Sequence, residues 1–561
     1  MLWDFLFLLL VLAPLVTGGI WINRPGIHLE YTQPGAAAAV LLLALWWMSR
    51  DGREPWKKSP LCRAGVSLWN TWTRWLDIRT AAALGVVWFF TSASSFTTGY
   101  LRHRGLGSGL ADLGIFTNAI ANVQAFGFPF SSLKNGQSLL TDHQDFLIYP
   151  LGWIFPLWPS PLFLLLIQAM IFSTTSAALY LLGRQRLGAS HPVVPWLPFA
   201  FLLCGPLRAA VRSDVHPEIL MMPFFLFAAY FLQERGVARR MAGFFFLLLA
   251  LAAKESAGPV ACGIGLAWLL GAGPVHTRSF TRPLGAAVLA LGAAVFYFDA
   301  HVVPSLFGIS YAYNDVYAPL GVTPLAVALS PFTQPMLFLN RLVNLARVKY
   351  FFGTLLPLAG IPLLAPAAVI AAVPGFLMLF LTNGDHRISL GYHYAVEPMV
   401  GFLFALPVAL ASETAVRWKK FLLPVIAVAG LISYGRGEPY YWRVYVPTPH
   451  QIWLRDELLP LIPRDRSVAA SYGFVPQLAV RRWVNQIPYY TDEASAPVDC
   501  ALIDREVNNT PLSLAGLYGA RARLLELKYS EDYRCGTLSL YRRPDGPSCF
   551  SAPAPSCPEA E

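Results

Sequence analysis

Charged side chains are scarce in this chain of 561 residues. They make up 13% of the sequence, whereas hydrophobic residues make up 55%. A soluble globular domain carries about 25% charged residues. Apolar runs of roughly 15–22 residues recur along the chain, and runs of this length can cross a bilayer as helices. The shortage of charge therefore argues against a soluble protein and predicts a polytopic α-helical membrane protein.

Several sequence patterns that define other protein classes are missing. The chain has no glycine-rich phosphate loop, which argues against a machine driven directly by a nucleotide. It has no Cys-x-x-Cys or Cys/His spacing of a structural zinc site, and no internal repeat of the kind often found in transporters. The net charge of +10 does not indicate nucleic-acid binding, because basic residues at the ends of apolar runs set membrane topology.

Cysteine is also infrequent, with seven residues in the chain. Four of them lie near the C-terminus, at Cys500, Cys535, Cys549 and Cys557. An even number of cysteines in a segment outside the cytoplasm permits disulfides. We weigh a Cys500–Cys535 disulfide against four reduced thiols, and the sequence does not decide between them.

Arginine and lysine set the expected topology. Residues 2–20 and 36–48 read as the first two spans, and the basic segment 50–79 then lies in the cytoplasm, either as an amphipathic surface helix or as a solvated linker. Alternating spans from there give about thirteen crossings of the bacterial cytoplasmic membrane, with the N-terminus inside and the C-terminus outside. The remaining basic clusters, at 184–186, 235–240, 278–282 and 417–420, all fall inside.

The composition changes near residue 435, where charges return and apolar runs shorten to the length of strands. Segments 467–470, 500–503 and 536–541 read as strands, and 451–459 and 511–525 read as helices. We therefore expect a small extracytoplasmic α/β domain. The expected organisation is a two-span addition with a linker (1–79), a transmembrane domain (80–434) with a catalytic outside loop (97–160), the α/β domain (435–543) and a disordered tail (544–561).

Four polar clusters fall at the outer ends of the expected spans, on one membrane face. The topology used only Arg and Lys, so the positions of the acids and histidines are an independent observation. Ionisable residues beside membrane spans are costly unless they face water, a ligand or each other. The clusters are Asp112 with Asp142, His143 and Asp145; Arg212 with Asp214, His216 and Glu218; Lys254 with Glu255; and Asp385, His386 and Arg387 with Tyr392, His393, Tyr394 and Glu397.

These residue types suit group transfer from a lipid-linked phosphate. A carboxylate such as Asp112 can take a proton from an acceptor hydroxyl or amine. Arg212, Lys254 or Arg387 can hold a phosphate leaving group. Histidines such as His143 can donate to phosphate oxygens or ligate a divalent metal, which we consider as a cofactor.

Each cluster also has a structural interpretation. Asp112 could cap a helix, and Lys254 with Glu255 could be a self-neutralised pair at the membrane surface. Asp214 and His216 could form an interfacial hydrogen-bond pair. Segment 385–387 could be an ordinary solvated loop. Arg341, Arg347 and Lys349 more simply meet lipid headgroups.

Five short motifs resemble a known family in the same order. The family comprises predicted polytopic bacterial and archaeal membrane proteins of unknown function, and it is usually placed beside the GT-C glycosyltransferases. The resemblance continues weakly through 468–482 and 498–504. The motifs are ADLGIF (111–116), TDHQDF (141–146), SDVHPEIL (213–220), AAKES (252–256) and GYHYAVEP (391–398).

The GT-C resemblance implies a membrane enzyme that uses polyprenyl-phosphate or polyprenyl-diphosphate sugars as donors. It also implies an acid near the start of the first large outside loop, where Asp112 matches, and a second acid in that loop, where Asp142 or Asp145 could match. We assign catalysis to Asp112, Asp142 and His143. We assign substrate binding to Arg212, Asp214, His216, Glu218, Lys254, Glu255, Arg387, Tyr392 and His393.

The expected function is the transfer of a sugar to a glycan, lipid or protein acceptor on the extracytoplasmic face. The expected partners are membrane lipid and the lipid-linked sugar, and no nucleic acid. Two other functions stay open at this point. A transporter or lipid flippase would move its substrate without chemistry, and a noncatalytic envelope assembly factor would use the α/β domain for binding.

Overall fold

The structure is a computed structural model that describes residues 20–24, 27–31, 60–273, 278–436, 447–492 and 496–557. The chain forms two compact units. Unit 1 comprises Met1–Ser95, Ala169–Ser213 and Pro217–Tyr440, and unit 2 comprises Phe96–Gln168, Asp214–His216 and Tyr441–Glu561. Apart from Ile20, the two spans expected at 2–20 and 36–48 lie outside the described residues. Strands β1 (Ile20–Arg24) and β2 (Ile27–Tyr31) form an antiparallel pair.

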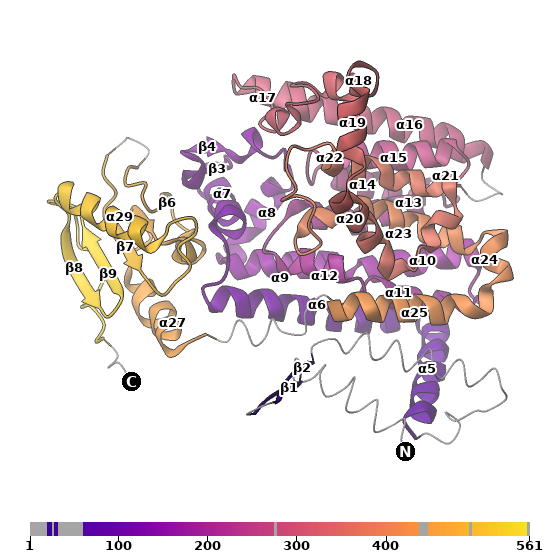
Figure 1. Cartoon of the computed structure of the whole chain (residues 1–561), viewed down its shortest axis with the longest axis horizontal. Coiled ribbons are helices and arrows are strands. Elements are labelled where there is room, and N and C mark those ends of the chain that lie inside the picture. The colour runs from indigo at the N-terminus through magenta and orange to yellow at the C-terminus, as the bar shows by residue number, and fades with distance from the viewer. Residues whose placement is uncertain are drawn as a thin grey trace. The chain divides into compact units, whose positions relative to one another are not determined.

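Unit 1 is built from helices (Figure 1). Each of the helices α6 (Thr80–Arg104) and α9 (Pro161–Ser173) begins in one unit and ends in the other. Segment 50–79 contains a helix, α5 (Pro60–Ile78), and its expected position on the membrane surface stays a prediction. The other helices of unit 1 are α10 (Thr175–Leu187), α11 (Leu197–Ala200), α12 (Gly205–Arg212), α13 (Pro217–Leu232), α14 (Val237–Leu251), α15 (Ala257–Leu269), α16 (Arg278–Tyr297), α17 (Val303–Leu306), α18 (Pro324–Thr333), α19 (Pro335–Leu342), α20 (Leu345–Leu355), α21 (Pro366–Val369), α22 (Val373–Phe380), α23 (Val396–Leu410), α24 (Glu413–Arg417) and α25 (Lys419–Arg436).

Few of the described helices are long enough to cross a bilayer unaided. By length and composition, four qualify, or five if the bent pair Val194–Ala200 and Gly205–Arg212 is one span. The expected helices are present, but many are short or broken by proline, so the expected count of about thirteen crossings is not confirmed. The four are Thr80–Arg104, Pro161–Leu187, Phe280–Leu306 and His393–Leu410.

Close packing of α15 on α16 shows how unit 1 is held together. A Cβ atom added at Gly265 would lie 2.7 Å from the Gly285 carbonyl oxygen, and one at Gly292 would lie 2.7 Å from the Gly258 carbonyl oxygen. Small residues let the backbones of membrane helices approach this closely, and the contact then comes from dispersion along the whole interface. Figure 1 shows the two helices running side by side.

Unit 2 combines the segment Phe96–Gln168 with the C-terminal α/β domain. Its helices and strands in this segment are α7 (Ile115–Phe126), β3 (Phe130–Ser131), β4 (Gln137–Ser138) and α8 (Ile148–Ile154). Those in the α/β domain are α27 (Pro449–Trp453), β5 (Val468–Ala470), α28 (Val475–Leu478), β6 (Val484–Gln486), β7 (Cys500–Asp504), α29 (Leu514–Glu526), β8 (Ser530–Cys535) and β9 (Leu538–Arg542).

The predicted C-terminal sheet is present, as the yellow strands of Figure 1 show. Its strand order is β6-β5-β7-β9-β8. β5 pairs in parallel with both β6 and β7, whereas β9 pairs antiparallel with β7 and with β8. β7 is buried along its length, which explains why its sequence CALID reads as a continuous apolar run.

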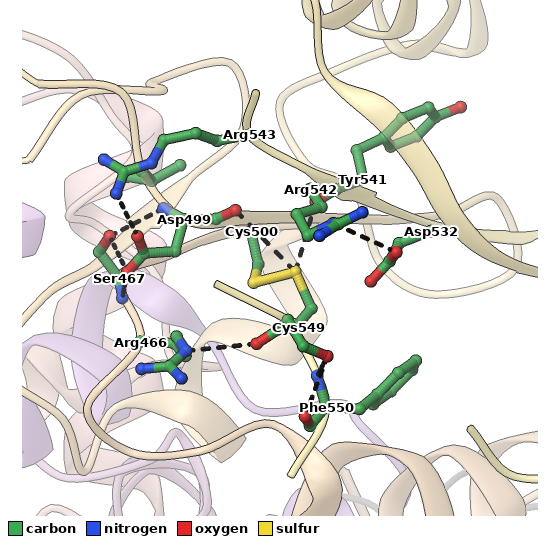
Figure 2. Close-up of a disulfide and its surroundings, with 12 residues drawn as sticks. Arg466, Ser467, Asp499, Cys500, Asp532, Tyr541, Arg542, Arg543, Cys549 and Phe550 are labelled. Atoms are coloured by element: carbon green, nitrogen blue, oxygen red, sulfur yellow. Dashed lines mark hydrogen bonds and ion pairs between the residues drawn. A yellow bond between two sulfur atoms is a disulfide. The ribbon is translucent and has the colours of Figure 1, made fainter. Parts of the chain in front are cut away.

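The four C-terminal cysteines form disulfides, but neither of the two alternatives weighed from the sequence is correct. Cys500 is bonded to Cys549, and Cys535 is bonded to Cys557. Figure 2 shows the first disulfide beside Asp499, whose carboxylate accepts hydrogen bonds from the Ser467 backbone N–H and hydroxyl, each at 3.0 Å. The connectivity of four cysteines has three solutions, and sequence alone does not choose among them.

The tail is consequently not disordered as far as Cys557. Residues 544–557 are described, and both disulfides attach them to the sheet. The Tyr533 hydroxyl also donates to the Pro555 carbonyl oxygen at 2.8 Å. Covalent cross-links thus order a segment whose composition is typical of disorder.

We predict that the Cys500–Cys549 disulfide stabilises the α/β domain strongly. The two cysteines lie 49 residues apart, and the chain-entropy relation gives about 4 kcal/mol for a loop of this size. Replacing both by serine should lower the free energy of unfolding by an amount of this order, measured by denaturation in detergent. In Cys500→Ser alone, Cys549 should react with a maleimide reagent after unfolding. An unreactive Cys549 would contradict the assigned pairing.

Candidate functional site

Asp112 lies in unit 2 on the π-helical turn Leu110–Gly114, directly before α7. Neither this turn nor α7 receives a side-chain cap, because their N-cap residues are Gly109 and Gly114. The interpretation of Asp112 as a helix cap is therefore wrong. Its side chain is 38% exposed, so the carboxylate can meet a substrate.

His216 faces this carboxylate. Its Nε2 atom lies 3.7 Å from Asp112 Oδ2, and its side chain is 5% exposed. The distance exceeds that of a hydrogen bond, so the contact is electrostatic. The pairing connects two of the polar clusters that the sequence singled out.

Asp214 fixes the backbone around Asp112. Its Oδ2 atom accepts a hydrogen bond from the Gly109 N–H at 2.7 Å and lies 3.3 Å from Arg102 Nη2. Its side chain is 1% exposed. A buried carboxylate is tolerated when cations and N–H groups face it in this way.

Gln168 holds the segment that carries Asp214 and His216. Its Nε2 donates to the Asp214 carbonyl oxygen at 2.7 Å, and its Oε1 accepts from the His216 N–H at 2.8 Å. The same side chain thus satisfies a donor and an acceptor of a buried backbone, which would otherwise be costly. Asp214 has a positive φ of 73°, a conformation that Asp adopts more readily than most residues.

Tyr472, from the α/β domain, reaches the same loop. Its hydroxyl packs against the backbone at Gly109, just before Asp112. A Cβ atom at Gly109 would lie 2.8 Å from this hydroxyl oxygen, so glycine is required for the close approach. Burial raises the pKa of Tyr472, and the Asp112 and Asp214 carboxylates raise it further. The hydroxyl therefore keeps its proton near neutral pH.

The other two residues assigned to catalysis have local partners. Asp142 Oδ2 lies 2.6 Å from Lys134 Nζ, so this carboxylate is already neutralised within the loop. The backbone N–H of His143 donates to the Leu139 carbonyl oxygen. Asp145 Oδ1 accepts from the Leu147 N–H at 3.0 Å before α8. The structure thus distinguishes Asp112 from these acids by its exposure and its partners.

A second polar group lies in unit 1 around Glu218, in the first turn of α13. Glu218 Oε1 lies 3.1 Å from Lys254 Nζ and 3.3 Å from His393 Nε2. The Glu218 side chain is 1% exposed. Three of the predicted clusters therefore contribute to this group. Lys254 pairs with Glu218, and not only with its neighbour Glu255 as the structural interpretation supposed.

Two more acids and two tyrosines lie near this pair. Glu255 and Glu397 are both buried. Tyr311 donates a hydrogen bond to Glu255, and burial together with that carboxylate raises the pKa of Tyr311 well above its ordinary value. Burial raises the pKa of Tyr317 to about 12. These hydroxyls are therefore protonated donors beside the carboxylates.

The remaining predicted residues of unit 1 differ in position. The Arg387 guanidinium lies 5.3 Å from the centre of the Tyr313 ring, and Arg212 is buried at the end of α12. Tyr392 is 56% exposed. The lipid-headgroup interpretation of Arg347 is wrong, because its side chain is 1% exposed and pairs with Asp385 at 3.0 Å.

Sequence reasoning missed the residues that hold Asp112 in place. Arg102 and Gln168 lie inside helices α6 and α9, with nothing around them to mark a site. Tyr472 belongs to the segment SYGF within 468–482, so the weak resemblance there was the available signal. The divalent metal considered from the sequence stays a prediction.

The family described as "Predicted membrane protein (DUF2079)" matches residues 102–513. The chain belongs to this family. The match covers all the motifs that carried the sequence resemblance, so the expected family is confirmed. No curated protein matches the sequence of this DUF2079 protein.

Solved structures similar to this DUF2079 protein have the GT-C fold that the resemblance implied. Apo ArnT from Cupriavidus metallidurans is 15% identical, with a TM-score of 0.46 over 84% of this chain and 98% of that one. The same protein bound to undecaprenyl phosphate is 12% identical, with a TM-score of 0.45 over 82% and 98%. The Archaeoglobus fulgidus oligosaccharyltransferase tethered to an acceptor peptide is 14% identical, with a TM-score of 0.38 over 74% and 69%. At these values the likeness carries no argument about activity.

We predict that Lys254 and Glu218 depend on each other for stability. Removing one partner of a buried pair leaves an uncompensated charge, which costs about 3–5 kcal/mol. Lys254→Met should therefore lower the free energy of unfolding by this amount, and adding Glu218→Gln should recover part of the loss. Lys349→Met, at an exposed lysine of the same unit, is the matched control. Equal losses in Lys254→Met and in the double variant would refute the coupling.

We also predict a pH dependence from Asp214 in this DUF2079 protein. Burial raises the pKa of Asp214 above its ordinary value, so the folded state keeps the proton to a higher pH than the unfolded state does. Stability should fall as pH rises from about 4 through this raised pKa. Asp214→Asn should flatten that part of the profile, measured as the thermal midpoint in detergent. Asp465→Asn, at a carboxylate 71% exposed, should leave the slope intact.

Proposed function

We propose that this protein is an integral membrane glycosyltransferase that uses a polyprenyl-phosphate or polyprenyl-diphosphate sugar. The observation that carries the proposal is the Asp112 group of unit 2. An exposed carboxylate that caps no helix faces a buried histidine 3.7 Å away. The backbone before it is fixed by a hydrogen bond to Asp214 and by the packing of Tyr472 against Gly109. A general base needs this combination of access and fixed direction.

In the proposed reaction, Asp112 accepts the proton of an acceptor hydroxyl or amine. The acceptor atom attacks the anomeric carbon as the bond from that carbon to the phosphate oxygen breaks. The electron pair of that bond leaves with the lipid phosphate. His216 holds the direction of the Asp112 carboxylate, and Arg102 keeps a positive charge beside Asp214.

The composition of the rest of the chain supports a lipid-linked donor. Apolar helices give a polyprenyl chain an apolar environment. The two disulfides of the α/β domain support an extracytoplasmic location for this domain, because disulfides persist in oxidising compartments. The acceptor is a glycan, lipid or protein on that side of the bacterial cytoplasmic membrane. Phosphate-binding roles for Lys254, Arg387 and Arg212 stay predictions.

A transporter or flippase, or an assembly factor, would not need a general base. Such a protein would bind or move undecaprenyl phosphate without releasing it from a sugar. The two classes therefore differ in whether the bond to phosphate breaks. The test below separates them with one substitution.

We predict that Asp112→Asn reduces sugar transfer by about 10²–10⁴-fold, the usual contribution of a general base. Purified full-length protein would be incubated with a panel of polyprenyl-phosphate hexoses and membrane extract as acceptor, and release of polyprenyl phosphate would be measured. Asp465→Asn is the matched control for loss of an exposed carboxylate. Binding of undecaprenyl phosphate should persist in Asp112→Asn. Full transfer by this variant would reject Asp112 as the base, and undecaprenyl phosphate bound without any transfer by the unmodified protein would favour a transporter.

A further inference from the structure

The strand order of the α/β domain contains a topological switch point. β5 is first in the chain and central in its parallel part, with β6 on one side and β7 on the other. After β5 the chain passes to β6 on one side of β5, and it later returns to form β7 on the other side. In open α/β sheets, ligands bind outside the carboxyl ends of the strands at such a point.

Here the first outside loop of the same chain contacts this edge. Tyr472 follows β5 by two residues, and its hydroxyl lies so close to Gly109 that a Cβ atom there would be 2.8 Å away. Gln477, in α28, donates from Nε2 to the His103 carbonyl oxygen at 2.7 Å. These two contacts hold both ends of the segment that leads from α6 to Asp112.

Leu106 anchors the middle of that segment. Its side chain is 2% exposed and belongs to the apolar core of the sheet, with Val468, Phe474 and Leu502. Its φ is +55°, a left-handed conformation that is unfavourable for leucine. Burial of the side chain in the core of the α/β domain offsets this strain. The loop is therefore shaped by the domain that it enters.

We infer that the C-terminal α/β domain is a clamp for the catalytic loop, and that Tyr472 is the residue that positions Asp112. The roles of Asp112 and the loop rest on the proposed function. Residues 106–112 of the same chain lie at the switch point of the sheet. In this domain they occupy the position where other open α/β sheets bind a ligand. Tyr472 acts through the backbone, because its hydroxyl lies against Gly109, three residues before Asp112.

This arrangement gives the Tyr472 hydroxyl one specific task. The hydroxyl lies against Gly109, the residue before the turn Leu110–Gly114 that carries Asp112. Asp214 accepts the hydrogen bond of the Gly109 N–H, so Tyr472 and Asp214 both hold the backbone at this residue. Loss of the hydroxyl frees one of the two backbone anchors beside Asp112 and leaves the packing of the ring in place.

The test is Tyr472→Phe in the full-length protein. Hydrogen exchange by mass spectrometry should show at least tenfold faster exchange in the peptide covering 105–114 and no change in the peptide covering 500–504. Transfer should show a kcat at least tenfold lower with a KM for the donor within twofold. Tyr489→Phe, at a tyrosine of the same domain that is 65% exposed, should change neither reading. Unchanged exchange in residues 105–114 would overturn the inference.

A second variant covers the case in which Tyr472→Phe fails to fold. Gly109→Ala would place a Cβ atom 2.8 Å from the Tyr472 hydroxyl oxygen, so it should also speed exchange and slow transfer. The double variant Gly109→Ala with Tyr472→Phe removes that clash and should be no worse than Tyr472→Phe alone. Additive losses would contradict a shared contact.

The experiments can reject the general base and the clamp independently of each other. Full transfer by Asp112→Asn together with faster exchange in Tyr472→Phe would reject the general base and keep the clamp. Loss of transfer in Asp112→Asn together with unchanged exchange in Tyr472→Phe would keep the general base and reject the clamp.

Discussion

Carboxylates buried in a largely apolar chain need compensating partners, and this need determines much of the local structure. Asp214 and Glu218 each have side chains that are 1% exposed. Asp214 is held by Arg102 and the Gly109 N–H, and Glu218 by Lys254 and His393. An uncompensated charge would destabilise either unit by several kcal/mol. The end of α6, the turn before α15 and the segment before α23 are therefore held where their side chains reach these two acids.

The two polar groups differ in what they expose. In unit 2, the buried Asp214 holds the backbone before Asp112, whose own carboxylate is 38% exposed. In unit 1, the central Glu218 is itself buried, and tyrosines and further acids lie around it. The first arrangement is typical of an acid–base residue on a rigid support. The second is typical of a binding environment, where protonated hydroxyls and carboxylates offer many hydrogen-bonding groups.

The sequence predicted local features well and long-range partners poorly. Apolar runs located the helices, and short apolar runs located β5, β7 and β9, because both signals depend on neighbouring residues. The same local reasoning found Asp112, His216, Glu218, Lys254 and His393. It could not find Tyr472 or Gln477, since the contact of Gln477 with His103 spans 374 residues of sequence. It also did not find Cys549 as the partner of Cys500, because spacing carries no information on disulfide connectivity.

The docking of Leu106 in the sheet core has a consequence for the order of events during synthesis. The ribosome makes the segment 103–112 early, whereas Phe474 and Leu502, which bury Leu106, are made near the end. Domains generally form as their chain emerges, but this loop must wait exposed until more than 350 further residues have been added. A nascent or truncated chain that already holds the helices of unit 1 would therefore lack an ordered Asp112. The loop that carries Asp112 is therefore ordered only after the strands of the α/β domain have been made.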